Sequence, residues 1–174
     1  QIVAGRKYHT VIDIGCGDGS FLRRVDAKNK IGVDASVEMI RLNSIYVPQA
    51  SYILGHFPDI PLQHNLIDMA HVSFVLDHVN DVNKFLVKTS KLLKSKGQFI
   101  LAEFNPESML NFRGHEEILK YRSLTGQVYE VQSNFSKLLN LEAMLKKYFD
   151  LEKMLSIDIG LEGIKIDYYL MRKK

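Results

Sequence analysis

Three glycines at alternate positions follow a short apolar run in the sequence VIDIGCGDGSFL, residues 11–22. Because glycine has no side chain, Gly15, Gly17 and Gly19 let a ligand approach the backbone closely and permit positive φ angles. The residues that follow, GSFLRRV, predict a helix whose first N–H groups and positive dipole end suit an anionic group. The run therefore predicts a ligand-binding turn between a strand and a helix.

A carboxylate stands at the end of the next apolar run. Asp34 closes KIGVD within the predicted strand at residues 30–35. In a parallel sheet the carboxyl ends of neighbouring strands meet at one edge, and an acid there can accept hydrogen bonds from both ribose hydroxyls. Its charge also repels a 2′-phosphate. The turn and the acid together predict an adenosine-containing ligand without that phosphate.

The glycine spacing separates two kinds of adenosine ligand. The dinucleotide fingerprint is G-x-G-x-x-G, whereas this chain has G-x-G-x-G, with Ser20 where the fingerprint has its third glycine. Asp13 precedes the turn on the same run. A pyrophosphate does not need a carboxylate beside it, but a ligand that carries an ammonium group does.

Apolar and amphipathic runs alternate along most of the chain, which predicts βαβ crossovers and a parallel sheet. Ser36 and Asp81 are predicted N-caps of two helices, and the second helix is expected to end at Gly97. Another helix is expected over residues 136–148, and a turn at residues 160–163 predicts a closing antiparallel hairpin. The predicted strands are residues 10–15, 30–35, 51–55, 66–72, 97–104, 149–159 and 163–172.

The predicted fold class is therefore α/β. We expect one domain over residues 1–174, with a doubly wound, mostly parallel seven-stranded sheet in a three-layer α/β/α sandwich. Residues 105–135 show no single strong period. This segment is the candidate cap of a site for a second substrate.

At these residues the chain resembles a known family. VIDIGCGDG resembles motif I of the class I S-adenosylmethionine-dependent methyltransferases, and GVDAS, residues 32–36, resembles their acidic motif II. Residues 52–79 and 91–104 resemble the family's third to fifth strands, and the resemblance covers nearly the whole chain except residues 105–135. It implies a Rossmann-like fold and S-adenosylmethionine as the cofactor.

The resemblance also implies roles at the methionine end of the cofactor. Asp13 is expected to hold the amino group through water, and Ser73 is expected to offer its backbone carbonyl nearby. The backbone of Gly15, Cys16 and Gly17 is expected to approach the methionine moiety.

Further roles concern the nucleoside. Asp34 is expected to hold the ribose, and Ala35 and Met39 are expected to contact the adenosine portion. After the third strand the family often has Gly-Asp-Ala, whereas this chain has glycine followed by His56 and Phe57. A neutral histidine nitrogen can accept a hydrogen bond from the adenine amino group, or the ring can stack on adenine. The N–H of Phe57 is expected to reach the adenine ring.

Methyl transfer needs alignment more than it needs acid–base chemistry. The sulfonium is already a good leaving group, so orientation of the acceptor is the main task, and a base is required only when the acceptor must lose a proton. His78 is the first candidate base, and Glu103 and His115 are weaker ones. The alternative for His78 is capping or packing of the next helix.

Composition excludes several other classes. The sole cysteine, Cys16, excludes an intrachain disulfide, fits a reducing compartment and indicates a cytoplasmic protein; we expect it to fill space rather than to act as a nucleophile. No apolar run is long enough to span a membrane, and the first ten residues, QIVAGRKYHT, do not have the apolar core expected of a signal peptide. The chain begins with glutamine, which is consistent with a trimmed N-terminus.

Charge and histidine spacing argue against nucleic acid and metal. The net charge is only +3, and the lysines at 84, 88, 91 and 94 predict a solvated helix face rather than a phosphate-binding patch, because no aromatic stacking residues are interleaved with them. The histidines at 56, 64, 71 and 78 fall on different elements, so no metal site is expected.

The leading hypothesis is thus a methyltransferase that acts on a small-molecule acceptor. Two alternatives stay open: a non-catalytic module that binds S-adenosylmethionine, and an NAD-binding oxidoreductase domain. The acceptor, the atom that is methylated and the oligomeric state are not determined by these residues.

Overall fold

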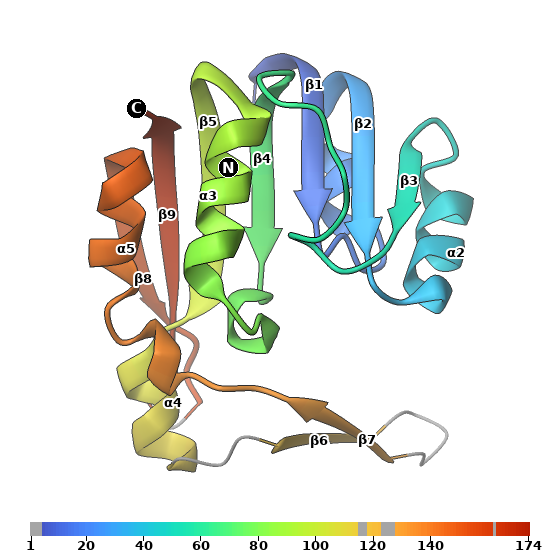
Figure 1. The fold of residues 1–174 in the computed structure, drawn as a ribbon. Coiled ribbons are helices and arrows are strands. Elements are labelled where there is room, and N and C mark those ends of the chain that lie inside the picture. Colours follow the sequence, from blue (N-terminus) through green and yellow to red (C-terminus); the bar gives the residue numbers. More distant parts are fainter. Residues whose placement is uncertain (1–4, 115–117, 123–127, 162) are drawn as a thin grey trace.

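The computed structural model describes residues 5–114, 118–122, 128–161 and 163–174 (Figure 1). Its main sheet has seven strands in the order β3-β2-β1-β4-β5-β9-β8. Neighbouring strands run parallel except at β9, which is antiparallel to both β5 and β8. The strands are β1 (Lys7–Ile14), β2 (Asp26–Asp34), β3 (Ser51–Leu54), β4 (Ile67–Ser73), β5 (Leu93–Phe104), β8 (Phe149–Asp158) and β9 (Lys165–Lys173). The predicted sheet is confirmed, including its antiparallel closing strand.

Each face of this sheet carries its own hydrophobic core. On one face α1 (Ser20–Arg24) and α2 (Val37–Tyr46) cover a smaller cluster that includes Leu22 and Met69. On the other, α3 (Val82–Leu92) and α5 (Leu141–Tyr148) cover a larger cluster that includes Phe85 and Phe99. Full burial of one such side chain is worth about 1.5–3 kcal/mol. The two cores give the expected three layers and hold the strand ends in place.

The predicted N-caps are confirmed. Ser36 Oγ accepts a hydrogen bond from the Met39 N–H at 3.3 Å, and Asp81 Oδ1 accepts one from the Lys84 N–H at 2.8 Å. Each cap satisfies one of the donors that a helix N-terminus leaves without an intrahelical partner. The starts of α2 and α3, which both follow the carboxyl ends of sheet strands, are therefore set locally.

The predicted end of the α3 helix is wrong. The helix ends at Leu92 rather than at Gly97, because Leu93 already pairs with Ile67 in the ladder between β5 and β4. Gly97 lies inside β5, next to a register shift in the pairing with β4, where a Cβ atom would lie 2.8 Å from the carbonyl oxygen of Lys94. Lys94 consequently lies in β5 and not on the lysine-bearing face of the helix.

The described residues between 105 and 135 include regular structure that the sequence did not predict. They contain α4 (Pro106–Arg113) and an antiparallel hairpin of β6 (Ile118–Arg122) and β7 (Val128–Gln132). Figure 1 shows the hairpin crossing below the carboxyl ends of the main strands. Asn105 caps α4 by accepting a hydrogen bond from the Ser108 N–H at 2.9 Å, and Pro106 occupies the first turn.

The helix expected over residues 136–148 is shorter than predicted. A 3₁₀ turn, η2 (Ser136–Leu138), comes first, and α5 begins at Leu141. Phe135 and Leu138 are both buried in the larger core, and the Leu138 N–H donates to the Phe135 carbonyl at 2.9 Å. Their burial bends the chain before the helix. Within the described ranges, no helix is long and apolar enough to cross a membrane.

Removal of the Asp81 cap tests how the start of α3 is stabilised. We expect Asp81→Ala to lower the free energy of unfolding by about 1 kcal/mol, because the Lys84 N–H loses its acceptor. Urea denaturation followed by circular dichroism measures this. Asp81→Asn keeps an acceptor oxygen and should lose much less, so equal losses in the two variants would contradict the assignment.

Candidate functional site

The turn after β1 uses backbone conformations that glycine adopts easily. Gly15 has φ +74°, and a Cβ atom at this position would overlap the side chain of Val75. Gly17 has φ +47°, and among the described residues nothing lies within 4 Å of the place that its Cβ would take. Gly15 therefore permits close packing against the loop after β4, whereas Gly17 leaves room beside the backbone for a ligand.

Two side chains on neighbouring elements hold this turn. Asp34 accepts hydrogen bonds from the Gly17 N–H through Oδ2 and from the Ser36 N–H through Oδ1, both at 2.9 Å. Asn43, buried on α2, donates to the Gly17 carbonyl at 3.3 Å and accepts from the Tyr52 hydroxyl at 2.8 Å. A carboxylate has about four acceptor positions, so Asp34 retains capacity for two more hydrogen bonds.

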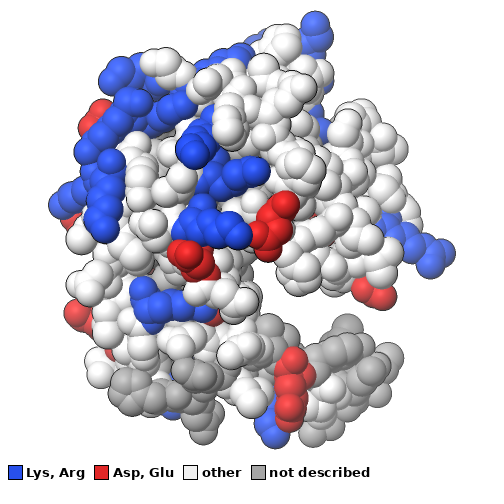
Figure 2. Space-filling view, in the orientation of Figure 1, with Lys and Arg blue, Asp and Glu red and all other residues white. Residues whose placement is uncertain are grey.

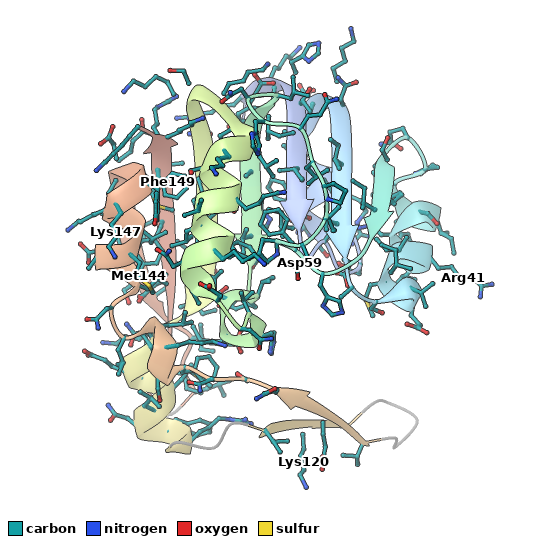
Figure 3. All side chains as sticks on the ribbon, viewed as in Figure 1. Arg41, Asp59, Lys120, Met144, Lys147 and Phe149 are labelled. Atoms are coloured by element: carbon teal, nitrogen blue, oxygen red, sulfur yellow. The ribbon has the colours of Figure 1, made fainter. Side chains whose placement is uncertain are left out.

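A cavity of about 760 Å³ opens at the carboxyl ends of β1, β2 and β4, where the strand order reverses. Its volume falls in the range typical of small-molecule sites. Asp59, labelled in Figure 3 between α3 and α2, is one of its lining residues. Of the residues predicted from the sequence, the structure brings together around this cavity Gly15, Asp34, Ala35, His56, Phe57, Ser73 and His78.

Four predicted cofactor residues do not line the cavity: Asp13, Cys16, Gly17 and Met39. Gly17 lies in the turn beside it, and its N–H is bonded to Asp34. Met39 is 38 % exposed on α2, where its N–H contributes to the helix cap. Their contacts with a cofactor stay predictions.

Asp13 lies beneath the turn, on β1. It is 2 % exposed, and its Oδ1 lies 2.7 Å from Nδ1 of His71 on the adjacent strand β4. The imidazole in turn stacks on Phe21 of α1, with ring centroids 3.8 Å apart. Burial raises the pKa of Asp13, while the hydrogen bond and charge of His71 oppose that shift. Asp13 thus fixes His71, which packs on the helix that follows the turn.

Cys16 is a buried thiol in the same turn. Burial raises its pKa to about 12, and the charges of Asp13 and Asp34 add to the effect. The thiol therefore stays protonated at neutral pH, where a nucleophile would need the thiolate. This agrees with the predicted role of filling space.

His78 lies between the cavity and the hairpin. Its Nδ1 is 2.6 Å from the carbonyl oxygen of Gln132 in β7, and its Nε2 is 3.6 Å from Oδ2 of Asp77. Because a carbonyl only accepts hydrogen bonds, Nδ1 must carry the proton of that bond. In neutral His78 the lone pair then lies on Nε2, on a side chain that is one-third exposed. This is the tautomer that a base acting through Nε2 requires.

Glu103 supports the loop that carries this histidine. The carboxyl is fully buried at the end of β5, and its Oε1 accepts hydrogen bonds from the Val75 N–H at 2.8 Å and the Leu76 N–H at 2.9 Å. Burial, together with the nearby charge of Asp77, raises the pKa of Glu103 to about 8. Glu103 does not line the cavity, and His115, the other weaker candidate base, lies outside the described residues.

Several supporting residues escaped the sequence analysis. Asn43 follows Ile40 by one helical turn, and a polar residue on that apolar face was an available signal. No local signal links Asp77 to Ser133, whose hydroxyl donates to Asp77 Oδ2, because they lie far apart in the sequence. Within the described ranges, no group of three or more His, Cys, Asp or Glu side chains is arranged to hold a metal ion.

Comparison with known proteins decides the family. The pattern of the methyltransferase domain family matches residues 12–101, which is more than half of the chain and runs from β1 into β5. The chain belongs to this family. It is a class I S-adenosylmethionine-dependent methyltransferase domain, and this membership favours a methyl donor over NAD in the glycine turn.

Relatives of this methyltransferase domain are distant. A demethylmenaquinone methyltransferase of Renibacterium salmoninarum is 25% identical over 146 residues, which cover 83% of this chain and 62% of that protein. An uncharacterized transposon protein of Streptomyces fradiae is 30% identical over 112 residues, which cover 60% of this chain and 32% of that protein. The chain spans about half the length of the curated relatives it matches.

Solved structures show the same fold. A putative S-adenosylmethionine-dependent methyltransferase from Listeria monocytogenes aligns with a TM-score of 0.75 at 17% identity, covering 95% of this chain and 91% of that one. A methyltransferase from Clostridium acetobutylicum aligns with a TM-score of 0.78 at 14% identity, covering 95% of this chain and 84% of that one.

The raised pKa of Glu103 predicts how the stability of this methyltransferase domain depends on pH. Between about pH 4.5 and pH 8 the folded state holds a proton on Glu103 that the unfolded state has lost, so this group makes wild-type stability fall as pH rises. We expect Glu103→Gln to gain stability relative to wild type across that interval, by about 2–5 kcal/mol in total at about 1.4 kcal/mol per pKa unit.

Chemical denaturation at a series of pH values measures the difference. Glu107→Gln, which alters an exposed carboxylate on α4, is the matched control and should follow the wild-type pH dependence. Parallel curves for wild type and Glu103→Gln would contradict the raised pKa.

Proposed function

We propose that the protein transfers a methyl group from S-adenosylmethionine to a small-molecule acceptor. The observation that carries the proposal is the cavity in which the glycine turn and the Asp34 carboxylate meet at the point where the strand order reverses. The reducing cytoplasm is the compartment that we propose, because the sole cysteine is a buried, free thiol.

The residues of the cavity fit the donor. Asp34 has acceptor positions left for the ribose hydroxyls, and the open space beside Gly17 would admit the methionine moiety. His56 and Phe57 line the same cavity and would contact the adenine ring, and Ser73 would face the amino group with its carbonyl. Bound there, S-adenosylmethionine supplies an electrophilic methyl group.

The remaining contribution of the chain is orientation. Holding donor and acceptor in line can supply about 7–11 kcal/mol of the barrier reduction. Where the acceptor is a hydroxyl, Nε2 of His78 would accept its proton, since Nδ1 is already committed to the Gln132 carbonyl. We propose that the same hydrogen bond holds the β6–β7 hairpin as a cap over the acceptor, within the segment 105–135.

Phe74 points to the kind of acceptor. It lines the cavity with a φ of +55°, a strained value for an aromatic residue, and remains 36 % exposed. Its ring packs on Phe104 with centroids 4.7 Å apart, which holds it in place. We propose an acceptor with a planar, apolar part that packs on Phe74. Two relatives are named for quinones, as demethylmenaquinone methyltransferase and ubiquinone biosynthesis O-methyltransferase.

Substitution of Asp34 tests the donor site. We expect Asp34→Ala to weaken the binding of S-adenosylhomocysteine by about 100-fold, since hydrogen bonds to a charged group contribute about 1.5–3 kcal/mol each. Isothermal titration calorimetry measures the affinity, and circular dichroism checks the fold. Glu38→Gln alters a nearby exposed carboxylate outside the cavity and should bind as wild type does. Wild-type affinity in a folded Asp34→Ala variant would remove the ribose role.

Substitution of His78 tests the base. With a phenolic acceptor found by screening with radiolabelled donor, we expect His78→Gln to lower kcat by about 10²–10⁴-fold. Donor affinity should stay unchanged. His64→Gln alters an exposed histidine away from the cavity and is the control. A wild-type kcat in His78→Gln would exclude the base, and donor binding without turnover of any acceptor would favour a non-catalytic module.

A further inference from the structure

A second cavity lies at the other end of the main sheet's strands, opposite the donor cavity. Its volume is about 450 Å³, and it lies where β1, β4 and β5 begin and β9 ends. It is remote from the donor cavity, because the eight residues of β1 between the two edges span about 25 Å. Basic side chains gather along this upper edge in Figure 2. Among the described lining residues the cations are Arg6, Lys7, Lys94, Lys96 and Arg172.

Carboxylates neutralise only part of this charge. Lys94 lies 2.7 Å from Asp68, which also lines the cavity, and Arg172 is bonded to Glu152. Lys96 lies 3.9 Å from Asp150, at the long end of ion-pair distances. In the part of the chain that the structure describes, neither Arg6 nor Lys7 forms an ion pair. The cavity therefore has an excess of two positive charges.

A buried amide without a partner belongs to one of the residues that line this cavity. Gln98, on β5, lines the cavity and is 3 % exposed, and its Nε2 has no hydrogen-bond partner among the described residues. A buried amide donor without an acceptor is costly, and such a group in a native fold indicates a missing ligand or water.

The orientation of that amide is set by its neighbours. The Tyr8 hydroxyl lies within hydrogen-bond distance of the Gln98 side-chain amide, and a phenol hydroxyl can act as a donor. It donates to Gln98 Oε1 at 2.5 Å. Burial raises the pKa of Tyr8, so the hydroxyl keeps this proton at neutral pH. With its oxygen held by Tyr8, Gln98 can only direct its NH₂ group elsewhere.

We propose that this cavity is an anion site that takes a phosphate monoester or inorganic phosphate, with Gln98, Arg6 and Lys7 as its donors. The dianion of a phosphate monoester carries about −1.5 to −2 charge at neutral pH, which matches the excess of two positive charges. Its oxygens supply the acceptor that Gln98 Nε2 lacks. The site is separate from the donor cavity and does not depend on the proposed methyl transfer.

Calorimetric titration with inorganic phosphate and with glycerol phosphate, at constant ionic strength, tests the site. We expect saturable binding of both, and tighter binding of the ester would show that an organic part is recognised as well. In two-dimensional NMR spectra the side-chain amide signals of Gln98 should shift on titration. Absence of saturable heat up to ~10 mM phosphate, or unmoved Gln98 signals, would overturn the proposal.

Three variants test the site further: two are expected to weaken phosphate binding, and one is expected to tighten it. Gln98→Glu keeps the oxygen that accepts from Tyr8 but replaces the free NH₂ by an anionic oxygen, so phosphate affinity should fall by more than about tenfold. Asp68→Asn removes a carboxylate from the lining and should tighten phosphate binding. Lys7→Gln should weaken it by about fivefold.

The matched control for Lys7→Gln is Lys147→Gln. Lys147, labelled in Figure 3 on α5, is exposed and does not line this cavity, and its loss changes the net charge by the same amount. Phosphate affinity should be unchanged in this control, and equal effects at the two lysines would reduce the site to non-specific attraction and overturn the proposal. Thermal unfolding and S-adenosylhomocysteine binding should be as in wild type for Lys7→Gln, which separates failure of this site from failure of the donor site.

Discussion

The parallel pairing of β1 with both β2 and β4 is the constraint on which the rest of this protein depends. It brings the carboxyl ends of three strands to one edge and places the reversal of strand order beside β1. At that edge Asp34 is bonded to the Gly17 N–H while still lining the cavity. The Asp34 carboxylate therefore shapes the turn and also offers free acceptor positions to a ligand. Its structural role and its proposed binding role belong to one side chain.

Buried polar groups near that edge hold the glycine turn and the loop after β4 in place. The pair of Asp13 and His71 supports the glycine turn from below, and Glu103 holds the loop after β4 through two backbone N–H groups. Burying a carboxyl without hydrogen bonds would be strongly unfavourable, so each acid is kept with partners on another element. The cavity walls are thus tied to the sheet by directional bonds as well as by apolar packing.

The loop after β4 is also tied to the hairpin. The Asp77 carboxylate accepts a hydrogen bond from the Ser133 hydroxyl, and the Asp77 backbone carbonyl accepts one from the Asn134 N–H at 2.9 Å. Nδ1 of His78 donates to the Gln132 carbonyl. Three consecutive residues at the end of β7 are therefore anchored to the short helical turn η1 (Leu76–His78). Movement of the proposed cap would have to break these bonds, so the cap and the proposed base are mechanically coupled.

The sequence by itself determined the features that depend on local chemistry. The alternation of strands and helices, the caps at Ser36 and Asp81, and the glycine turn with Asp34 all follow from short-range spacing, and the family resemblance reaches the same residues. The helix α4 had local signals too, in Asn105 and Pro106, although the segment around it lacked a clear period.

The tertiary structure decided what depends on residues that are distant in the sequence. The end of α3 is set by the pairing of Leu93 with Ile67, and no residue inside the helix predicts that the helix ends there. The amide orientation of Gln98 is set by Tyr8, and the tautomer of His78 by Gln132, each through a hydrogen bond that spans more than fifty residues. Hydrogen bonds of this kind depend on the direction of each group once the sheet has formed, and a pattern of residue types carries no direction.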